Sequence, residues 1–436
     1  MLTSLVLLAA LTNITTISDE TTFSKYPSIA FDAKGRRWVA WTTHREGKDQ
    51  VVINGERVDG GDGLESNAQV VITPAGEPLV VWHGRRQGMF AVYAREKRGG
   101  RWERETRVAT NALHPTIARD RRGTVWAAWE TPKQGGFSVR LARRSGRSWI
   151  EVARIESAGS DRRPVLAAAA DEGVWIAWDS TRSGNYDIFL QHSSRLTSAP
   201  IQVTRHATID DSPSLAVAKD GGVWIAWNGM RGHANDTYRA DRHSGDAFVR
   251  VLRDGVLLAP PAVAGSIPGQ VSFGSKNKSA REAVDPYWHW KQTQNYPIVT
   301  IDGAGRAWII WRTDATGAHN FDLWARVHDG ARWSPELHLT EFSPGRDEWP
   351  VAAVAPDGAL HLAWEGQVLP KPGDEAKYLG GDVDAYNTLG LPNVVLTATA
   401  TAPENGWIDA ALKPAPEERF IAAEMNEPPL AGPAPR

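Results

Sequence analysis

Two sets of polar residues recur along this chain next to apolar runs. One set directly follows a tryptophan that ends an apolar run, and the other directly precedes such a run, in most copies before a proline. Histidine, carboxylate, arginine and tyrosine side chains can exchange protons or hold charged groups, so both sets are candidates for a site. The first set is Thr42, His83, Glu130, Asp179, Asn228, Arg312 and Glu365, and the second is Tyr26, Asn67, His114, Arg163, Ser212, Tyr296 and Trp349.

The carboxylates of the first set suggest one possible chemistry. A pair drawn from Glu130, Asp179 and Glu365 could act as acid and base in glycoside hydrolysis. His83, His114 and Glu130 could instead hold a metal ion, but no local ligand spacing supports this, and we predict no metal site. The sequence identifies no cofactor.

The histidines suggest a second chemistry. His83 and His114 could abstract and return a proton beside a tyrosine, while Arg163 or Arg312 neutralises a uronate, as a polysaccharide lyase requires. A third possibility is that the polar ring binds a partner or a glycan without turnover. We predict that substrate is contacted by Tyr26, Arg163, Tyr296, Arg312 and Trp349, together with Trp288 and Trp290.

The elements that position these residues follow from an internal repeat. An apolar strand ends on tryptophan seven times, and the copies are mostly 41 to 53 residues apart, with one gap of 84. This period is the length of one four-stranded propeller blade. We number the copies units one to seven, and they end their apolar run at Trp41, Trp82, Trp129, Trp178, Trp227, Trp311 and Trp364.

The repeat predicts an all-β fold, a single seven-bladed β-propeller of four-stranded antiparallel blades. Six blades are the alternative if the first or last copy is degenerate. Residues 13–18 resemble the fourth strand of other copies, so we expect the N-terminal strand to close the ring by completing the last blade. The predicted domains are a signal peptide at 1–12, the propeller at 13–407, and a poorly ordered Pro- and Ala-rich tail at 408–436.

An insertion at about 254–294 separates units five and six. Its second half concentrates aromatic residues, including Trp288 and Trp290, in a segment that belongs to no blade. The segment is either a lid-like loop that packs on the rim or a stacking wall over the central pocket.

Residues that recur at one offset in most copies are expected to serve the scaffold. Basic residues stand four positions after the tryptophan in units one to five, for example Arg86 and Arg182, and we predict that they tie their loop to carbonyls or carboxylates of the adjacent blade. Asp32, Asp120, Asp220 and Asp302 are predicted to form turns.

Composition excludes several classes of protein. The 436 residues include no cysteine, which rules out disulfides and a cysteine nucleophile. A net charge of −2 lacks the excess of positive charge that is typical of nucleic-acid-binding proteins. The apolar run Leu2–Leu11 has the length of a signal-peptide core, and no other segment approaches a membrane span. We therefore expect a secreted or periplasmic monomer.

One stretch carries a family resemblance. Trp178 to Phe189, read as WDSTRSGNYDIF, resembles repeats in bacterial propellers of the sialidase-like superfamily and of TolB-like proteins. The resemblance implies a propeller fold and favours a carbohydrate-binding or carbohydrate-cleaving function. The arginine triad and the nucleophile pair of sialidases cannot be mapped onto this chain. We predict an exported propeller that recognises a glycan or similar polar polymer at the channel mouth, as a hydrolase, a lyase or a binder. The alternative is a non-catalytic scaffold that binds another protein.

Overall fold

The computed structural model describes residues 10–61, 63–206, 208–229, 246–262, 268–271, 294–313, 321–343, 345–367 and 392–416. Every regular element in these ranges is a β-strand. The described residues thus contain no helix of the length and apolarity that a membrane crossing needs.

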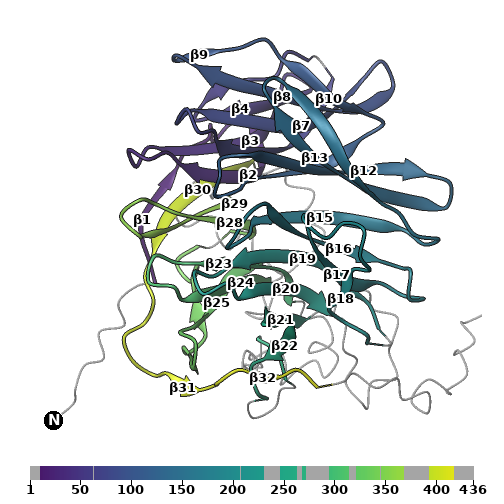
Figure 1. Ribbon diagram of the computed structural model, residues 1–436. Coiled ribbons are helices and arrows are strands. Elements are labelled where there is room, and N and C mark those ends of the chain that lie inside the picture. The colour runs from purple at the N-terminus through teal and green to yellow at the C-terminus, as the bar shows by residue number, and fades with distance from the viewer. Residues whose placement is uncertain are drawn as a thin grey trace, which may run out of the picture.

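The strands follow the tryptophan repeat (Figure 1). Each unit contributes a first, a second and a third strand that pair antiparallel in chain order. The first strands are β2 (Phe23–Phe31), β6 (Leu64–Ile72), β11 (Leu113–Arg119), β15 (Asp161–Ala168), β19 (Asp210–Val217), β23 (Gln294–Ile301) and β28 (Asp347–Val354). The second strands are β3 (Arg37–Arg45), β7 (Pro78–Arg86), β12 (Val125–Lys133), β16 (Val174–Ser180), β20 (Val223–Gly229), β24 (Ala307–Thr313) and β29 (Leu360–Gln367).

The strands outside the first two vary more in length from unit to unit. The third strands are β4 (Lys48–Ile53), β8 (Met89–Arg98), β13 (Gly136–Ser145), β17 (Asp187–His192), β21 (Asp246–Arg253), β25 (Asp322–His328) and β30 (Asn393–Ala400). Outside them lie β5 (Glu56–Arg57), β9 (Arg101–Trp102), β10 (Thr106–Thr110), β14 (Ser148–Ile155), β18 (Ile201–Gln202), β22 (Val256–Ala259), β26 (Arg332–Trp333) and β27 (Leu337–His338).

Contacts between units run in chain order and return to the start. Each first strand contacts the first strand of the next unit, from β2 through to β28, and β28 contacts β2. The N-terminal strand β1 (Leu11–Thr16) pairs antiparallel with β30, so the two ends of the repeat region lie side by side (Figure 1). Units one and two share one hydrogen-bonded sheet through a single parallel bridge between Asp49 and Leu64.

The core consists of the apolar layers between neighbouring sheets. One cluster joins Ala177 and Ile188 of unit four to Ile225 and Trp227 of unit five. Both faces of each second strand are covered, which explains its nearly continuous apolar sequence. The seven strand-ending tryptophans are only 0–4% exposed. Burying about 200 Å² of indole at roughly 25 cal/mol per Å² favours the folded chain by about 5 kcal/mol each.

Acidic residues satisfy the buried indole N–H groups in four units. The acceptor lies 17 residues before the tryptophan, at the start of the first strand. The hydrogen bond compensates for the burial of both the indole N–H group and the carboxylate. The pairs are Trp82 with Glu65 at 2.7 Å, Trp178 with Asp161 at 3.1 Å, Trp227 with Asp210 at 2.8 Å and Trp364 with Asp347 at 2.6 Å.

The predicted turn-forming aspartates are confirmed. Asp32 Oδ1 accepts hydrogen bonds from the N–H groups of two turn residues, Lys34 and Arg36, and Asp120 Oδ1 accepts the equivalent pair. Asp302 and Asp220 each accept one such bond, from the N–H groups of Arg306 and Gly222. In Asp32, Asp120 and Asp302 the second oxygen accepts the indole N–H of the tryptophan that opens the following strand, for example Trp38 at 3.3 Å. These residues belong to the scaffold.

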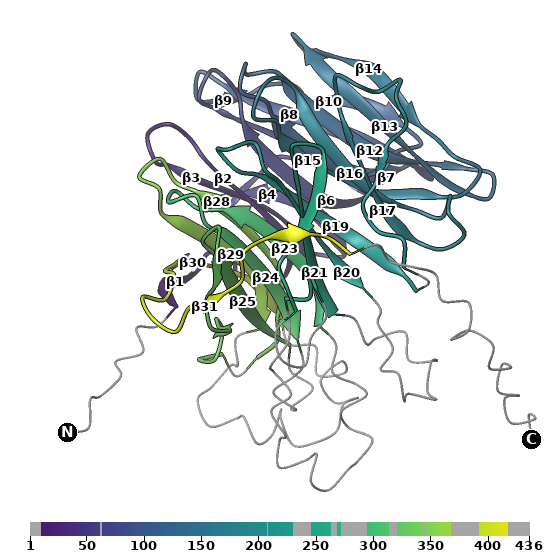
Figure 2. The ribbon, with the colours of Figure 1, turned by 60° about the horizontal axis from the view of Figure 1, so that its bottom comes forward.

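The two ends of the chain differ from the predicted domain limits. Leu11 and Thr12 were assigned to a signal peptide, but they belong to β1, and residues 1–9 lie outside the described part. The predicted tail is ordered over its first residues: β31 (Ile408–Asp409) pairs with β26, and β32 (Lys413–Pro414) pairs with β22. Figure 2 shows this yellow segment leaving the last unit for the neighbouring sheets.

Candidate functional site

The residues predicted to precede the first strand lie inside it. Each first strand begins two to four residues earlier than expected and contains a β-bulge at the residue predicted to precede it. A bulge redirects a side chain, and left-handed backbone at a residue other than glycine costs about 1 kcal/mol or more. The φ values are Tyr26 54°, Asn67 56°, His114 47°, Arg163 48°, Ser212 54°, Tyr296 51° and Trp349 53°.

The residues that follow the tryptophan hold these bulges from the preceding unit. In several units the side chain accepts a hydrogen bond from the backbone N–H of the next unit's bulge residue. This bond satisfies a donor that the bulge removes from the strand ladder. The pairs are His83 Nδ1 with His114 N at 3.3 Å, Glu130 Oε1 with Arg163 N at 2.8 Å, Asp179 Oδ2 with Ser212 N at 3.2 Å, and Glu365 with Tyr26 N.

Two predicted catalytic carboxylates therefore have a structural task. The side chains of Glu130 and Asp179 are both 0% exposed, and Arg163 lies between them, bonded to Glu130 through its backbone N–H and to Asp179 through Nε. The structure does not present these two carboxylates as an open acid–base pair.

His83, His114 and Glu130 form the first polar cluster of the ring. The two imidazole rings are perpendicular, with centroids 5.1 Å apart, and His114 Nδ1 lies 3.1 Å from Glu130 Oε2. Burial and the neighbouring His114 lower the pKa of His83 to about 4, so His83 is neutral at pH 7. Burial acts to raise the pKa of Glu130, but His114, the Arg163 N–H and Arg162 together lower it below its usual value.

The hydrogen bonds of this cluster fix both imidazole tautomers. His83 Nδ1 accepts a backbone N–H, so its own proton is on Nε2. The ionised Glu130 can only accept, so His114 Nδ1 donates to it and His114 Nε2 is the acceptor when the ring is neutral. The side chain of His114 is 46% exposed, which leaves a base held in place by a buried carboxylate.

Arg163 is neutralised by carboxylates of units four and five. Its guanidinium bonds to Asp179 through Nε and to Asp211 Oδ2 at 3.2 Å. Complete burial raises the pKa of Asp179 to about 7, although Arg163 opposes this shift. This charge balance weakens the prediction that Arg163 neutralises a uronate.

Three adjacent bulge residues form an aromatic arc, consisting of Tyr296, Trp349 and Tyr26. The ring centroids of Tyr296 and Trp349 are 4.6 Å apart, and those of Trp349 and Tyr26 are 5.7 Å apart. Arg312 lies over Tyr296 and Trp349, with its Cζ 4.6 Å and 4.9 Å from their ring centroids. The structure thus brings together four of the predicted substrate-binding residues from units one, six and seven.

A carboxylate pair lies beside the aromatic arc. Glu348 and Glu365 are directly opposite each other on β28 and β29, and both are buried. Arg312 and Arg346 both donate to Glu348 Oε1. Burial and the charge of Glu348 raise the pKa of Glu365 to about 7, against the effects of Lys25 and the hydrogen bond from Asn393.

Burial and the charges of Glu365 and Glu348 also raise the pKa of Tyr26, which places the arc next to this pair. A carboxyl group whose pKa is raised by burial and by a neighbouring carboxylate can act as a general acid near neutral pH.

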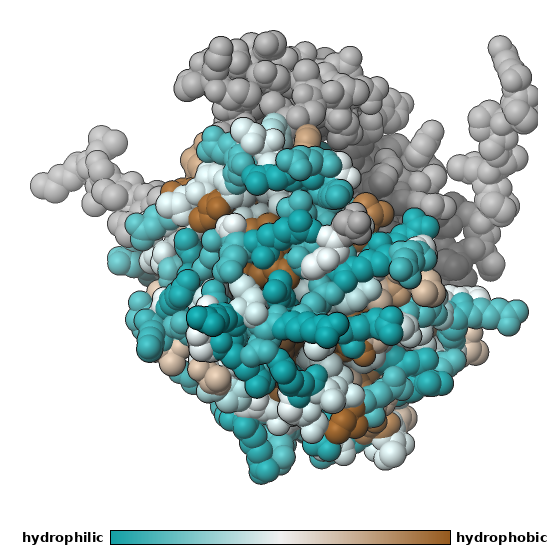
Figure 3. Space-filling view, turned by 90° about the horizontal axis from the view of Figure 1, so that it is seen from above, coloured by the Kyte–Doolittle hydropathy of each residue, from teal (hydrophilic) through white to brown (hydrophobic). Residues whose placement is uncertain are grey.

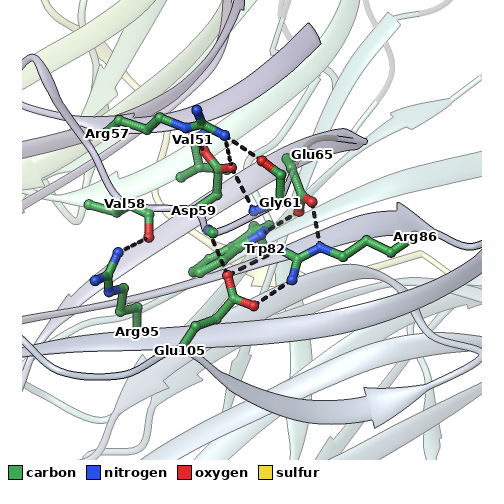
Figure 4. Close-up of polar contacts among 11 residues, drawn as sticks. Val51, Arg57, Val58, Asp59, Gly61, Glu65, Trp82, Arg86, Arg95 and Glu105 are labelled. Carbon is green, nitrogen blue, oxygen red and sulfur yellow. Dashed lines mark hydrogen bonds and ion pairs between the residues drawn. The ribbon is translucent and has the colours of Figure 1, made fainter.

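The recurring basic residues were predicted to bond to the adjacent blade, but those of units two, three and four bond within their own unit, and Arg231 of unit five lies outside the described residues. Arg86 joins Glu65 at 2.7 Å to Glu105 at 2.5 Å, and Glu65 also holds the Trp82 indole (Figure 4). Arg182 likewise bonds to Asp161. They do not form an anion site.

Sequence reasoning missed Glu348, Arg162 and Asp211, which stand directly before a bulge residue. These positions pair across the strands with the residue after the tryptophan, so the register of the first hairpin could have identified them. Trp288 and Trp290 lie outside the described residues.

Comparisons with known proteins give remote structural likeness. No family model and no curated protein sequence matches the chain. Similar solved structures include a protein described as TolB from Agrobacterium tumefaciens, with 15% identity over 56% of this chain and 84% of that chain and a TM-score of 0.37.

Two further structures are of proteins named for carbohydrate activities. The α-L-arabinofuranosidase Arb93A of Fusarium graminearum is 13% identical over 76% of this chain and 92% of its own, with a TM-score of 0.43. The Hadza microbial sialidase Hz136 is 12% identical over 74% of this chain and 70% of its own, with a TM-score of 0.43. Likeness at these identities and TM-scores transfers no residue role and no activity to this chain.

Proposed function

We propose that this protein is an exported glycan-binding β-propeller that hydrolyses a glycosidic bond, with the aromatic arc as its sugar platform. In this proposal the seven units are seven blades, and β1 closes the ring. Aromatic faces suit the apolar faces of sugar rings, and Tyr26 is 38% exposed. The observation that carries the proposal is the arc lying beside the Glu348–Glu365 pair.

The two carboxyl groups differ in a way that hydrolysis requires. Glu365, with its pKa near 7, can hold a proton at neutral pH and donate it to the leaving glycosidic oxygen. Glu348, which accepts hydrogen bonds from Arg312 and Arg346, would activate a water molecule or attack the sugar itself. Oε2 of Glu365 is buried and has no hydrogen-bond partner among the described residues, so that oxygen is not committed to the scaffold.

The test is mass spectrometry of products after incubation with neutral, uronate-containing and sialylated oligosaccharides. We expect water-added fragments, lost in Glu365→Gln and retained in the matched control Glu341→Gln, which changes an exposed glutamate. Intact oligosaccharides that still bind with Trp349-dependent affinity would reject hydrolysis and leave the glycan-binding proposal. Absence of both cleavage and binding would favour the protein-binding scaffold.

A lyase is a second candidate, favoured by the Glu130–His114 pair. His114 Nε2 would abstract the proton on the carbon next to a uronate carboxylate, and Glu130 would hold the imidazolium that results. A C=C bond would then form as the glycosidic C–O bond on the adjacent carbon breaks, and the imidazolium would return its proton to the leaving oxygen. Unsaturated products that vanish in His114→Gln, but persist in Glu365→Gln, would assign the cleavage to this cluster.

Export and quaternary structure complete the proposal. A signal peptide at the N-terminus, a secreted or periplasmic location and a monomeric state are expected on the sequence evidence given above. Fractionation of the native host and light scattering of the purified protein would test them.

A further inference from the structure

Positive charge is concentrated in one part of this nearly neutral chain. Residues 95–147 contain 14 Arg and Lys against five Asp and Glu, a net charge of +9, whereas the whole chain carries −2. This segment covers the outer half of unit two and nearly all of unit three. A charge asymmetry of this size points to an anionic partner.

The turns of these two units gather arginines around a hollow of about 590 Å³. The turn after β6, the turn after β8 and the two turns of unit three line it, and they bring Arg98, Arg122 and Arg144 together. The bulges lie near the start of the first strands and these turns lie at their far end, so the hollow is on the opposite face from the aromatic arc. A side chain at Gly123 would meet Pro74 at 2.9 Å, so the two turns that form its wall are in close contact.

A smaller hollow extends the same surface. Both hollows are lined by Glu96 and Arg144, and the smaller one adds Arg104 and Arg147. Figure 3 views the molecule from the top of Figure 1, where β8, β9 and β10 lie, and this side is largely hydrophilic. We call this surface, defined by Arg98, Arg104, Arg121, Arg122, Arg144 and Arg147, the arginine face.

Internal ion pairs neutralise only part of the arginine face. Arg98 and Arg144 both donate to the same oxygen of Glu96, at 2.7 Å each, so one carboxylate serves two guanidinium groups. Arg147 pairs with Glu103, and Arg122 pairs at its exposed end with Glu172 of unit four. Arg104 and Arg121 are exposed and form no ion pair within the described part of the chain. The donors left over match the oxygens of carboxylate and sulfate groups.

We propose that the arginine face binds an acidic polysaccharide through its carboxylate or sulfate groups. The lining of the larger hollow favours this class over single-stranded nucleic acid, because it contains no aromatic residue and base stacking is the usual basis of single-strand binding; Trp149 lines only the smaller hollow. The hollow between two units accepts one anionic group, and the exposed arginines on the flanking turns reach neighbouring groups of a polymer. This site does not depend on the function proposed for the opposite face.

The test measures binding to immobilised dextran sulfate and polygalacturonate, with uncharged dextran as the reference and single-stranded DNA as the competing class. The variant Arg104→Glu/Arg121→Glu reverses two arginines without ion pairs, and Lys34→Glu/Arg195→Glu makes the same change of net charge at exposed positions of units one and four. We expect the first variant to bind at least one of the two acidic polymers about tenfold more weakly and to show a shallower salt dependence between about 50 and 200 mM salt. The control variant should bind as wild type does.

Several results would overturn the proposal. Equal losses of binding in both double variants would show that binding depends only on the net charge of the protein. Unchanged binding in the first variant would exclude the arginine face as the binding site. Wild-type binding to DNA as tight as to either polysaccharide, with the same sensitivity to Arg104 and Arg121, would overturn the assignment to polysaccharide. Preference between dextran sulfate and polygalacturonate identifies sulfate or carboxylate as the preferred group.

Discussion

Replacing Glu365 by glutamine should make the protein more stable at alkaline pH and leave its stability unchanged near pH 4. Burial and the neighbouring Glu348 raise the pKa of Glu365 from 4.5 to about 7. Between these values the folded state keeps the proton while the unfolded state releases it. Stability of the wild type therefore falls as the pH rises from 4.5 to 7 and then stays at the lower level.

The size of the effect follows from the shift. About 2.5 pH units at 1.36 kcal/mol each amount to roughly 3 kcal/mol at pH 8. Glu365 is only 4% exposed, so solvent screens this penalty little. Glutamine resembles the protonated carboxyl group in shape and carries no charge, so Glu365→Gln removes the penalty and keeps the side chain that Asn393 and Tyr26 contact.

Urea unfolding followed by tryptophan fluorescence, at about pH 4 and about pH 8, measures the effect. The quantity of interest is the difference between variant and wild type, because other groups titrate in both proteins. Glu341→Gln should show no such difference at either pH. Equal or lower stability of Glu365→Gln at pH 8 would refute the argument that burial and Glu348 hold this carboxyl group protonated.

Three further changes test the scaffold by the same urea titration. Trp227→Ala should lower the free energy of unfolding by about 3–5 kcal/mol, because it empties a buried layer between units four and five, and a loss below 1 kcal/mol would contradict this packing. Arg163→Ala should cost about 3 kcal/mol at pH 8 and less at pH 5, where Asp179 can take up a proton, and a loss independent of pH would contradict the ion pair. Gly84→Ala should cost about 2 kcal/mol, because its new Cβ would lie 2.1 Å from Glu65 Oε2, whereas a Cβ at Gly60 meets its nearest atom at 3.4 Å, so Gly60→Ala should be tolerated.

The sequence predicted the strands better than the details at their starts. Tryptophan spacing and turn chemistry located the second strands, the turn-forming aspartates and the third strand Asn393–Ala400, because these features depend on local periodicity. The first strands begin earlier than predicted because a left-handed bulge residue such as Tyr26 interrupts the pattern of the strand without ending it. Which polar residues meet across units depends on register between sheets, and no local pattern reports that register.

The scaffold explains why a polar residue stands at each of these positions, but it does not explain which residue type each unit carries there. A strained bulge residue recurs in all seven units, and side chains such as Glu130 and Asp179 hold the next bulge, so their burial reflects the scaffold. Arg312 occupies the same position in unit six, but a guanidinium cannot accept a hydrogen bond, and it instead lies over Trp349 and pairs with Glu348. The repeat departs from its own pattern at the aromatic arc. A departure that adds stacking rings and raises the pKa of Glu365 beside a second carboxylate does not serve the repeat itself, and this is the physical ground for placing the site there.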